Sequence, residues 1–154
     1  MHLTLRFLTI GLLTAQVACS RQPQASSPPY EAVTDVRRTM ELIIDPAAEV
    51  VWDSAGSVIT EAGEQDLAPA SPEAWAKVEA AAAVLTESGN LLMMPGRSAG
   101  PDWDEHARAL IRGGELATAA AQQQDAGALF DAGGRIYEVC LACHTQYVAD
   151  DSAQ

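Results

Sequence analysis

The residues with the clearest chemical potential lie near the C-terminus, in the run Cys140-Leu141-Ala142-Cys143-His144. On a helix, residues three and four positions apart share one face, so both thiols and the imidazole would point the same way. Two thiols can add to the vinyl groups of a haem while the adjacent imidazole binds its iron, and this C-x-x-C-H spacing is typical of c-type haem attachment. The motif predicts one covalent haem c per chain, with His144 as an iron ligand.

Two other kinds of site use the same cysteine spacing. A redox-active dithiol usually opens a helix directly after a strand, and no strand is expected before Cys140. A zinc site needs a second pair of ligands, but His106 and His144 are the only histidines beyond the N-terminal segment. We therefore favour haem over a dithiol, half a zinc site or a chance match.

The N-terminus has the layout of an export signal. Residues 1–18 contain one basic residue, Arg6, then a short apolar stretch and small residues, as in a secretory signal peptide. Cys19 follows Ala18 as in a bacterial lipoprotein processing site, and ordinary cleavage after Ser20 is the alternative. We expect a periplasmic protein, either free or tethered to a membrane through lipidated Cys19.

The remaining chain divides by composition. Residues 19–29 are rich in Pro and Ser and predict a flexible tether. Residues 30–149 hold the periodic apolar pattern of a folded domain, and residues 150–154 form a short polar tail.

The first part of this domain, about residues 30–53, predicts a helix with an interruption. Its apolar stripe is Val33, Val36, Met40 and Ile43. Pro46 lacks an amide hydrogen and clashes with the preceding turn, so we expect a kink or a restart, with Asp45 as the N-cap of the new helix.

Three further segments show spacings of three and four. They begin after Ser71-Pro72, at Asp102 and at about Ala126, and the last ends at about Val148. Their stripes are Trp75, Val78, Ala82, Leu85, Gly89 and Leu92; Trp103, Ala107, Leu110, Gly114, Ala117 and Ala121; and Leu129, Ala132, Ile136, Val139 and Cys143. No segment alternates with period two, so residues 54–71 are expected to be a loop and the fold an all-α, antiparallel four-helix bundle.

The net charge and the absence of catalytic motifs argue against two classes of function. The formal net charge is -12, which disfavours nucleic-acid binding and weakly favours a basic protein partner. The sequence shows no catalytic triad, carboxylate pair or phosphate loop, so we do not expect an enzyme.

The position of the motif on the last of four helices resembles the class II cytochromes c, the cytochrome c-prime group and its low-spin relatives. The resemblance implies a haem inside the bundle near one end, with Cys140 and Cys143 at the thioether positions and His144 as proximal ligand. Low-spin members place a Met on the first helix as sixth ligand and transfer electrons to a redox protein partner, and Met40 matches that position. High-spin members leave the sixth position open and bind small gases, which is the alternative function. The resemblance also implies a homodimer as one arrangement, through the first two helices.

Several other residues have side chains suited to a role at the haem. Met93, Met94 and His106 are rivals to Met40 as distal ligand, and core packing or surface exposure is the simpler interpretation of all three. Arg97 and Arg135 match the carboxylate geometry of haem propionates, although surface ion pairs are the commoner role. We expect Tyr147 to pack on the proximal side of the haem, and the pair Gly133-Gly134 to mark either a close helix approach or a kink.

Overall fold

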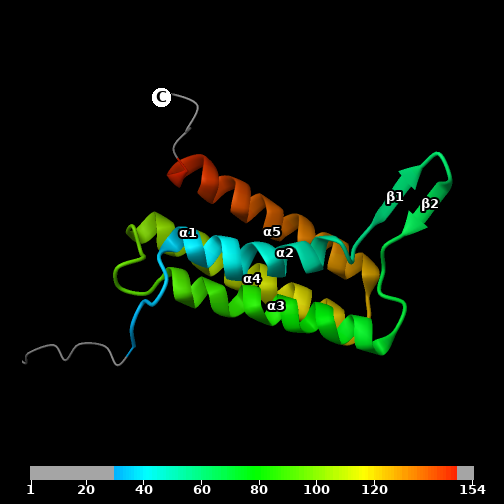
Figure 1. Cartoon of the computed structure of the whole chain (residues 1–154), viewed down its shortest axis with the longest axis horizontal. Helices are drawn as coiled ribbons and strands as arrows, with labels where there is room; N and C mark the ends of the chain where they lie inside the picture. The colour runs from blue at the N-terminus through cyan, green and yellow to red at the C-terminus, as the bar shows by residue number, and fades with distance from the viewer. Residues whose placement is uncertain (1–29, 149–154) are drawn as a thin grey trace, which may run out of the picture. The chain divides into compact units, whose positions relative to one another are not determined.

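The computed structural model describes residues 30–148. The predicted signal peptide, Cys19, the tether and the C-terminal tail lie outside this range. The described chain is mostly helical, with one small two-stranded sheet (Figure 1). None of its helices has the length and apolar character needed to cross a membrane.

The helical elements follow one another along the chain with few interruptions. In order they are α1 (Val36–Thr39), the π-helix η1 (Met40–Ile44), α2 (Asp45–Trp52), α3 (Pro72–Leu92), α4 (Pro101–Gln123) and α5 (Ala126–Tyr147). α3 packs along α4 and α4 along α5, while α2 contacts both α3 and α5. Figure 1 shows these helices lying side by side, with the hairpin to one side of them.

Local sequence signals explain where the long helices begin. The Ser71 hydroxyl accepts a hydrogen bond from the amide of Ala74, and the Asp125 carboxylate accepts one from the amide of Ala128. Each satisfies an amide that has no partner within its own helix. α4 begins at Pro101, one residue before the predicted start, after Gly100 at φ +119°.

The first helical segment differs from prediction in two ways. It begins at Val36, where the Asp35 carboxylate accepts the amide of Arg38 at 2.7 Å, rather than near residue 30. Asp45 has helical dihedral angles of -58° and -52°, so its predicted role as an N-cap is wrong. The backbone passes Pro46 without restarting, because a wide π-turn precedes the proline.

The prediction of no sheet is wrong for residues 54–71. β1 (Ser57–Thr60) and β2 (Gly63–Asp66) form an antiparallel hairpin in which Thr60 faces Gly63. Both strands are exposed at every position, so no alternation of apolar and polar residues marks them in the sequence. The β-branched run Val58-Ile59-Thr60 is the local signal, and Gly63 takes the φ of +122° that the turn requires.

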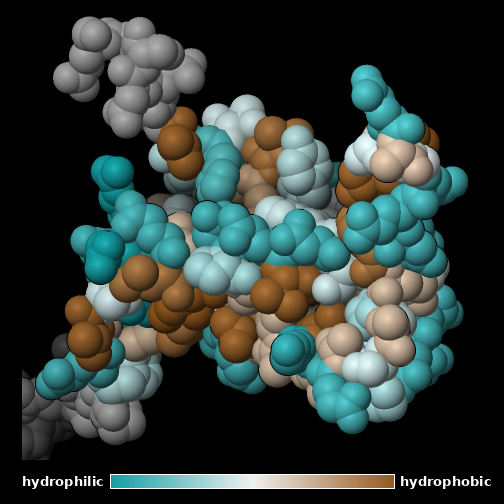
Figure 2. Space-filling model, turned by 45° about the vertical axis from the view of Figure 1, so that its right-hand side comes forward, coloured by the Kyte–Doolittle hydropathy of each residue, from teal (hydrophilic) through white to brown (hydrophobic). Residues whose placement is uncertain are grey.

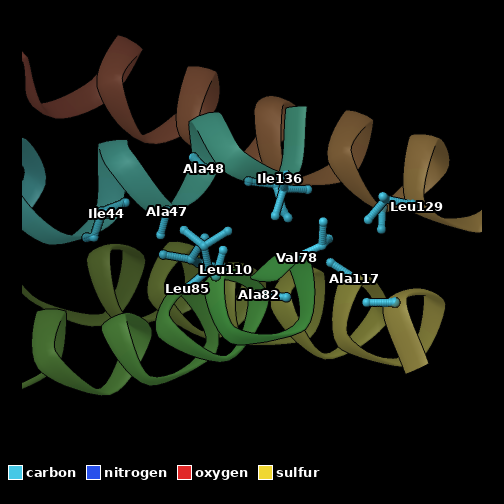
Figure 3. Close-up of a cluster of buried hydrophobic side chains, with 14 of the residues drawn as sticks. Ile44, Ala47, Ala48, Val78, Ala82, Leu85, Leu110, Ala117, Leu129 and Ile136 are labelled. Atoms are coloured by element: carbon cyan, nitrogen blue, oxygen red, sulfur yellow. The ribbon is translucent and has the colours of Figure 1, made fainter. Parts of the chain in front are cut away.

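A core rich in alanine fills the space between the helices (Figure 3). All predicted stripe residues of α3 and α4 are buried, as are Leu129, Ala132 and Ile136 of α5. The first segment departs from prediction: Val33 is 89% exposed, and the buried apolar side chains are Ile44, Ala47, Ala48 and Val51. The surface is not uniformly polar, and Figure 2 shows hydrophobic patches between hydrophilic strips on one face.

Glycines allow α3 and α4 to approach closely. A Cβ atom at Gly114 would lie 2.8 Å from the backbone nitrogen of Thr86 and 3.0 Å from the carbonyl oxygen of Ala82. A Cβ atom at Gly89 would lie 2.6 Å from the carbonyl oxygen of Ala107. The side chains of Ile111 at Gly89 and of Thr86 at Gly114 are also in contact, but the backbone atoms cannot turn aside, so neither position accepts a side chain without the helices moving apart.

Candidate functional site

A cavity of about 420 Å³ lies where α3 ends, α4 begins and the last turns of α5 pass. Its lining residues are mostly apolar: Met40, Glu41, Ile44, Asp45, Ala48, Trp52, Leu92, Trp103, His106, Ala107, Leu110, Tyr137, Val139, Cys140, Leu141, Cys143 and His144. Its volume falls within the range of about 300–1,000 Å³ that is common for cofactor sites. In Figure 1 the ribbon of α5 diverges from α1 and α2 toward its C-terminal end.

One wall of the cavity carries the motif. Cys140, Cys143 and His144 all line it from α5, so the face expected from their spacing is turned toward the cavity. Both cysteines are half-buried free thiols, whereas His144 is exposed. Burial raises the pKa of both thiols, and the charges of Cys143 and Asp45 raise the pKa of Cys140 further. At neutral pH these groups are therefore protonated thiols rather than thiolates.

Met40 lines the same cavity from η1, a different element. It is half-buried and packs against the hydrophobic core. The rivals Met93 and Met94 do not line the cavity. The structure therefore brings Met40 together with the motif and leaves those two methionines outside.

Two aromatic side chains join α2 to α5 beside the cavity. The indole Nε1–H of Trp52 donates to the carbonyl oxygen of Gly133 at 3.0 Å, and its ring meets Tyr137 edge-on at 6.3 Å. A Cβ atom at Gly133 would lie 3.3 Å from the Trp52 ring, while nothing lies within 4 Å of such an atom at Gly134. Gly133 thus serves close approach, which decides between the two explanations given for the glycine pair.

A second aromatic cluster joins α4 to the end of α5. Trp103 is buried, and its Nε1–H donates to the carbonyl oxygen of Leu92 at 2.8 Å. Tyr147 packs edge-on against Trp103 at 5.0 Å and is not part of the cavity lining, which differs from its expected place. His106 does line the cavity, and its Nε2 pairs with Oε1 of Gln146 at 3.0 Å. That pair links α4 to the last turn of α5.

The charged groups at the cavity differ from those expected. Glu41 and Asp45 line it, whereas no Lys or Arg among the described residues does. Arg97 is 8% exposed and donates to the carbonyl oxygens of Thr34 and Leu91, so its predicted pairing with a propionate or a surface acid is wrong. Arg135 is exposed on α5 and lies outside the cavity lining.

Several lining residues were not anticipated from the sequence. Tyr137 and Leu141 flank Cys140 at spacings of three and one, and Tyr137, Leu141 and His144 follow the helical spacing of the motif itself. That spacing is the signal that could have identified them. Glu41 and Asp45 carry no comparable signal, because their direction depends on the π-turn.

The residues present fit a haem. The lining is apolar enough to enclose a large flat macrocycle, two thiols and an imidazole share one wall, and a thioether comes from another element. Within the described residues, no group of three or more His, Cys, Asp or Glu side chains is arranged to hold a metal ion by itself. Comparison with protein-family models, curated proteins and solved structures yielded no match.

Proposed function

We propose that this chain is an exported c-type cytochrome that transfers electrons, built as an antiparallel four-helix bundle with one haem c near one end. The observation that carries the proposal is the shared cavity: Cys140, Cys143, His144 and Met40 come from opposite ends of the described chain and line one space. When bound, haem c supplies one-electron exchange at its iron.

The thiols of Cys140 and Cys143 are the attachment points. Each sulfur and its hydrogen would add across one vinyl double bond of the haem, so a thioether would form without gain or loss of electrons. Attachment at two points on one helix turn fixes the orientation of the cofactor relative to α5.

His144 and Met40 are the residues that would bind the iron. An imidazole together with a thioether would favour ferrous iron and raise the reduction potential. The buried side chains of Trp103, Leu92, Ala107 and Leu110 make the inner part of the cavity apolar. A preformed apolar wall would limit reorganisation when the charge changes, which suits electron transfer.

The remaining parts of the proposal concern location and partners. We place the protein in the periplasm, with a membrane tether through Cys19 if that residue is lipidated, and we assign it a redox protein as partner. The net charge of -12 supports a partner with a basic surface. Sedimentation experiments on the purified holo protein test whether it forms a homodimer.

Mass analysis tests covalent attachment. The full chain, expressed with a haem-attachment system and cleaved by protease, should yield a peptide containing Cys140 and Cys143 with the added mass of one haem. The double variant C140S/C143S should lose that mass. A wild-type peptide without it would reject the proposal.

Substitution of Met40 tests its ligation. M40A should convert a six-coordinate spectrum into a five-coordinate one and abolish the Met-to-iron charge-transfer band. M93A is the matched control, because Met93 also packs against the core but does not line the cavity. An unchanged M40A spectrum would favour the gas-binding alternative with an open sixth position.

A further inference from the structure

The π-turn before Pro46 is the one wide turn in the described helices. In η1 the amide of Asp45 donates to the carbonyl oxygen of Met40, five residues back. A proline in a regular α-helix would clash with the carbonyl four residues earlier and leave it without a donor. The wider turn accommodates Pro46, and π-turns of this kind are common at functional sites.

The turn also joins two apolar faces that are out of phase. Stepping back from buried Ile44 by the three and four residues of a regular helix leads to Glu41 and Met40, and then to Arg37. The observed inward side chains are instead Thr39, fully buried, and Val36, which packs against the core. The Arg37 side chain is 85% exposed. The faces before and after η1 are therefore offset by one residue, which is the excess that a π-turn absorbs.

Met40 and Glu41 of η1 both line the cavity, and the offset decides which of them also packs against the hydrophobic core. In a regular helix every residue before the turn would move one place, about 100° around the axis. Glu41 would then take the place of Met40, and Arg37 the place of Val36. In the structure the Glu41 carboxylate instead pairs with Arg37 at 3.0 Å and Arg38 at 3.2 Å.

We infer that the wide turn at Met40–Ile44, held by Pro46, is the positioning element that turns the Met40 thioether inward toward the cofactor and leaves the Glu41 carboxylate with its exposed arginine partners. The inference rests on the proposed haem function, and it makes Pro46 a positioning residue that acts through Met40. It also explains why a residue unfavourable to helices stands in the middle of the segment that supplies a ligand.

The experiment removes the excess residue and the proline together. In the full holo chain, Leu42 is deleted and Pro46→Ala is introduced, so a regular helix can keep Val36, Thr39 and Met40 in their present directions. Leu42 is 55% exposed, so its loss removes little packing. We expect this variant to fold, to carry covalent haem by mass, and to retain the Met-to-iron charge-transfer band at full intensity.

A matched control deletes exposed Glu49 from the regular part of the same segment, where no excess residue exists. That deletion turns Met40 by about one residue relative to the helix beyond it, and the band should be lost. The inference is overturned if the Leu42 deletion with P46A unfolds or loses the band, or if the Glu49 deletion retains it. If the parent protein itself lacks the band while carrying covalent haem, Met40 ligation fails, and this inference fails with it.

Discussion

The close packing of α3 on α4 gives a quantitative prediction for one glycine. Gly114→Ala places a methyl group 2.8 Å from the backbone nitrogen of Thr86 and 3.0 Å from the carbonyl oxygen of Ala82. The Thr86 hydroxyl is also in the way, but these two backbone atoms cannot turn aside, so relief requires the helices to separate. We assign this overpacking the upper part of its usual range, about 3 kcal/mol. Alanine recovers about 1 kcal/mol through its higher helix propensity, so the net loss is about 2 kcal/mol.

Gly134→Ala is the matched control, because the same substitution in α5 meets nothing within 4 Å. It should stabilise the protein by about 1 kcal/mol through helix propensity alone. At about 2–4 °C per kcal/mol for a chain of this size, G114A should lower Tm by about 4–8 °C and G134A should raise it by about 2–4 °C. Thermal unfolding followed by circular dichroism measures both. Equal shifts of the same sign would refute the packing derived for α3 and α4.

Three further predictions concern charge and the core. Asp45→Asn should raise the reduction potential of the holo protein in a redox titration, because a negative charge at the cavity stabilises the oxidised iron. Asp131→Asn is the control: this residue lies outside the cavity lining, so the potential should not change. Arginine partners lower the pKa of Glu41 and Glu105, so the stability from these carboxylates is present at neutral pH and lost as pH falls below their ordinary value of 4.5. Urea midpoints measured from pH 7 to pH 3 should fall only in that acidic window, and a flat profile would contradict the ion pairs. Ile136→Ala, at a fully buried position, should cost about 2–5 kcal/mol in the same urea assay, and a loss below 1 kcal/mol would contradict its place in the core.

The sequence predicted the helices whose apolar residues are large and regularly spaced. Trp75, Val78 and Leu85 form such a stripe in α3, and the Ser71-Pro72 pair marked its start. In α4, Trp103 and Leu110 play the same part. These signals are local, so no knowledge of the other helices was needed to read them.

The π-turn and the hairpin were beyond the reach of the same reasoning. The stripe from Val36 to Ile43 and the buried face from Ile44 to Val51 each have helical spacing, and only their offset reveals the wide turn. The hairpin has exposed strands, so it leaves no periodic burial pattern. Both features depend on how the segments pack rather than on local preference.

The candidate site likewise contains residues that the local sequence predicted and residues that only the tertiary structure revealed. The motif predicted the shared face of Cys140, Cys143 and His144, because that face follows from helix geometry alone. The nearness of Met40 was expected from a resemblance, and the structure places Met40 at the same cavity. The presence of Glu41 and Asp45 at the cavity could be predicted only from the tertiary structure, since the π-turn sets the direction of both side chains. The true role of Arg97, which ties the chain near Thr34 to the end of α3, required the tertiary structure too.

The optical spectrum of the holo protein, oxidised and reduced, with and without carbon monoxide, tests the central claim most directly. A closed site with His144 and Met40 as ligands predicts a low-spin spectrum with a Met-to-iron charge-transfer band that carbon monoxide does not change. A high-spin spectrum that shifts as soon as the gas is added would contradict Met40 ligation and electron transfer as the function, and would favour a gas-binding haem protein.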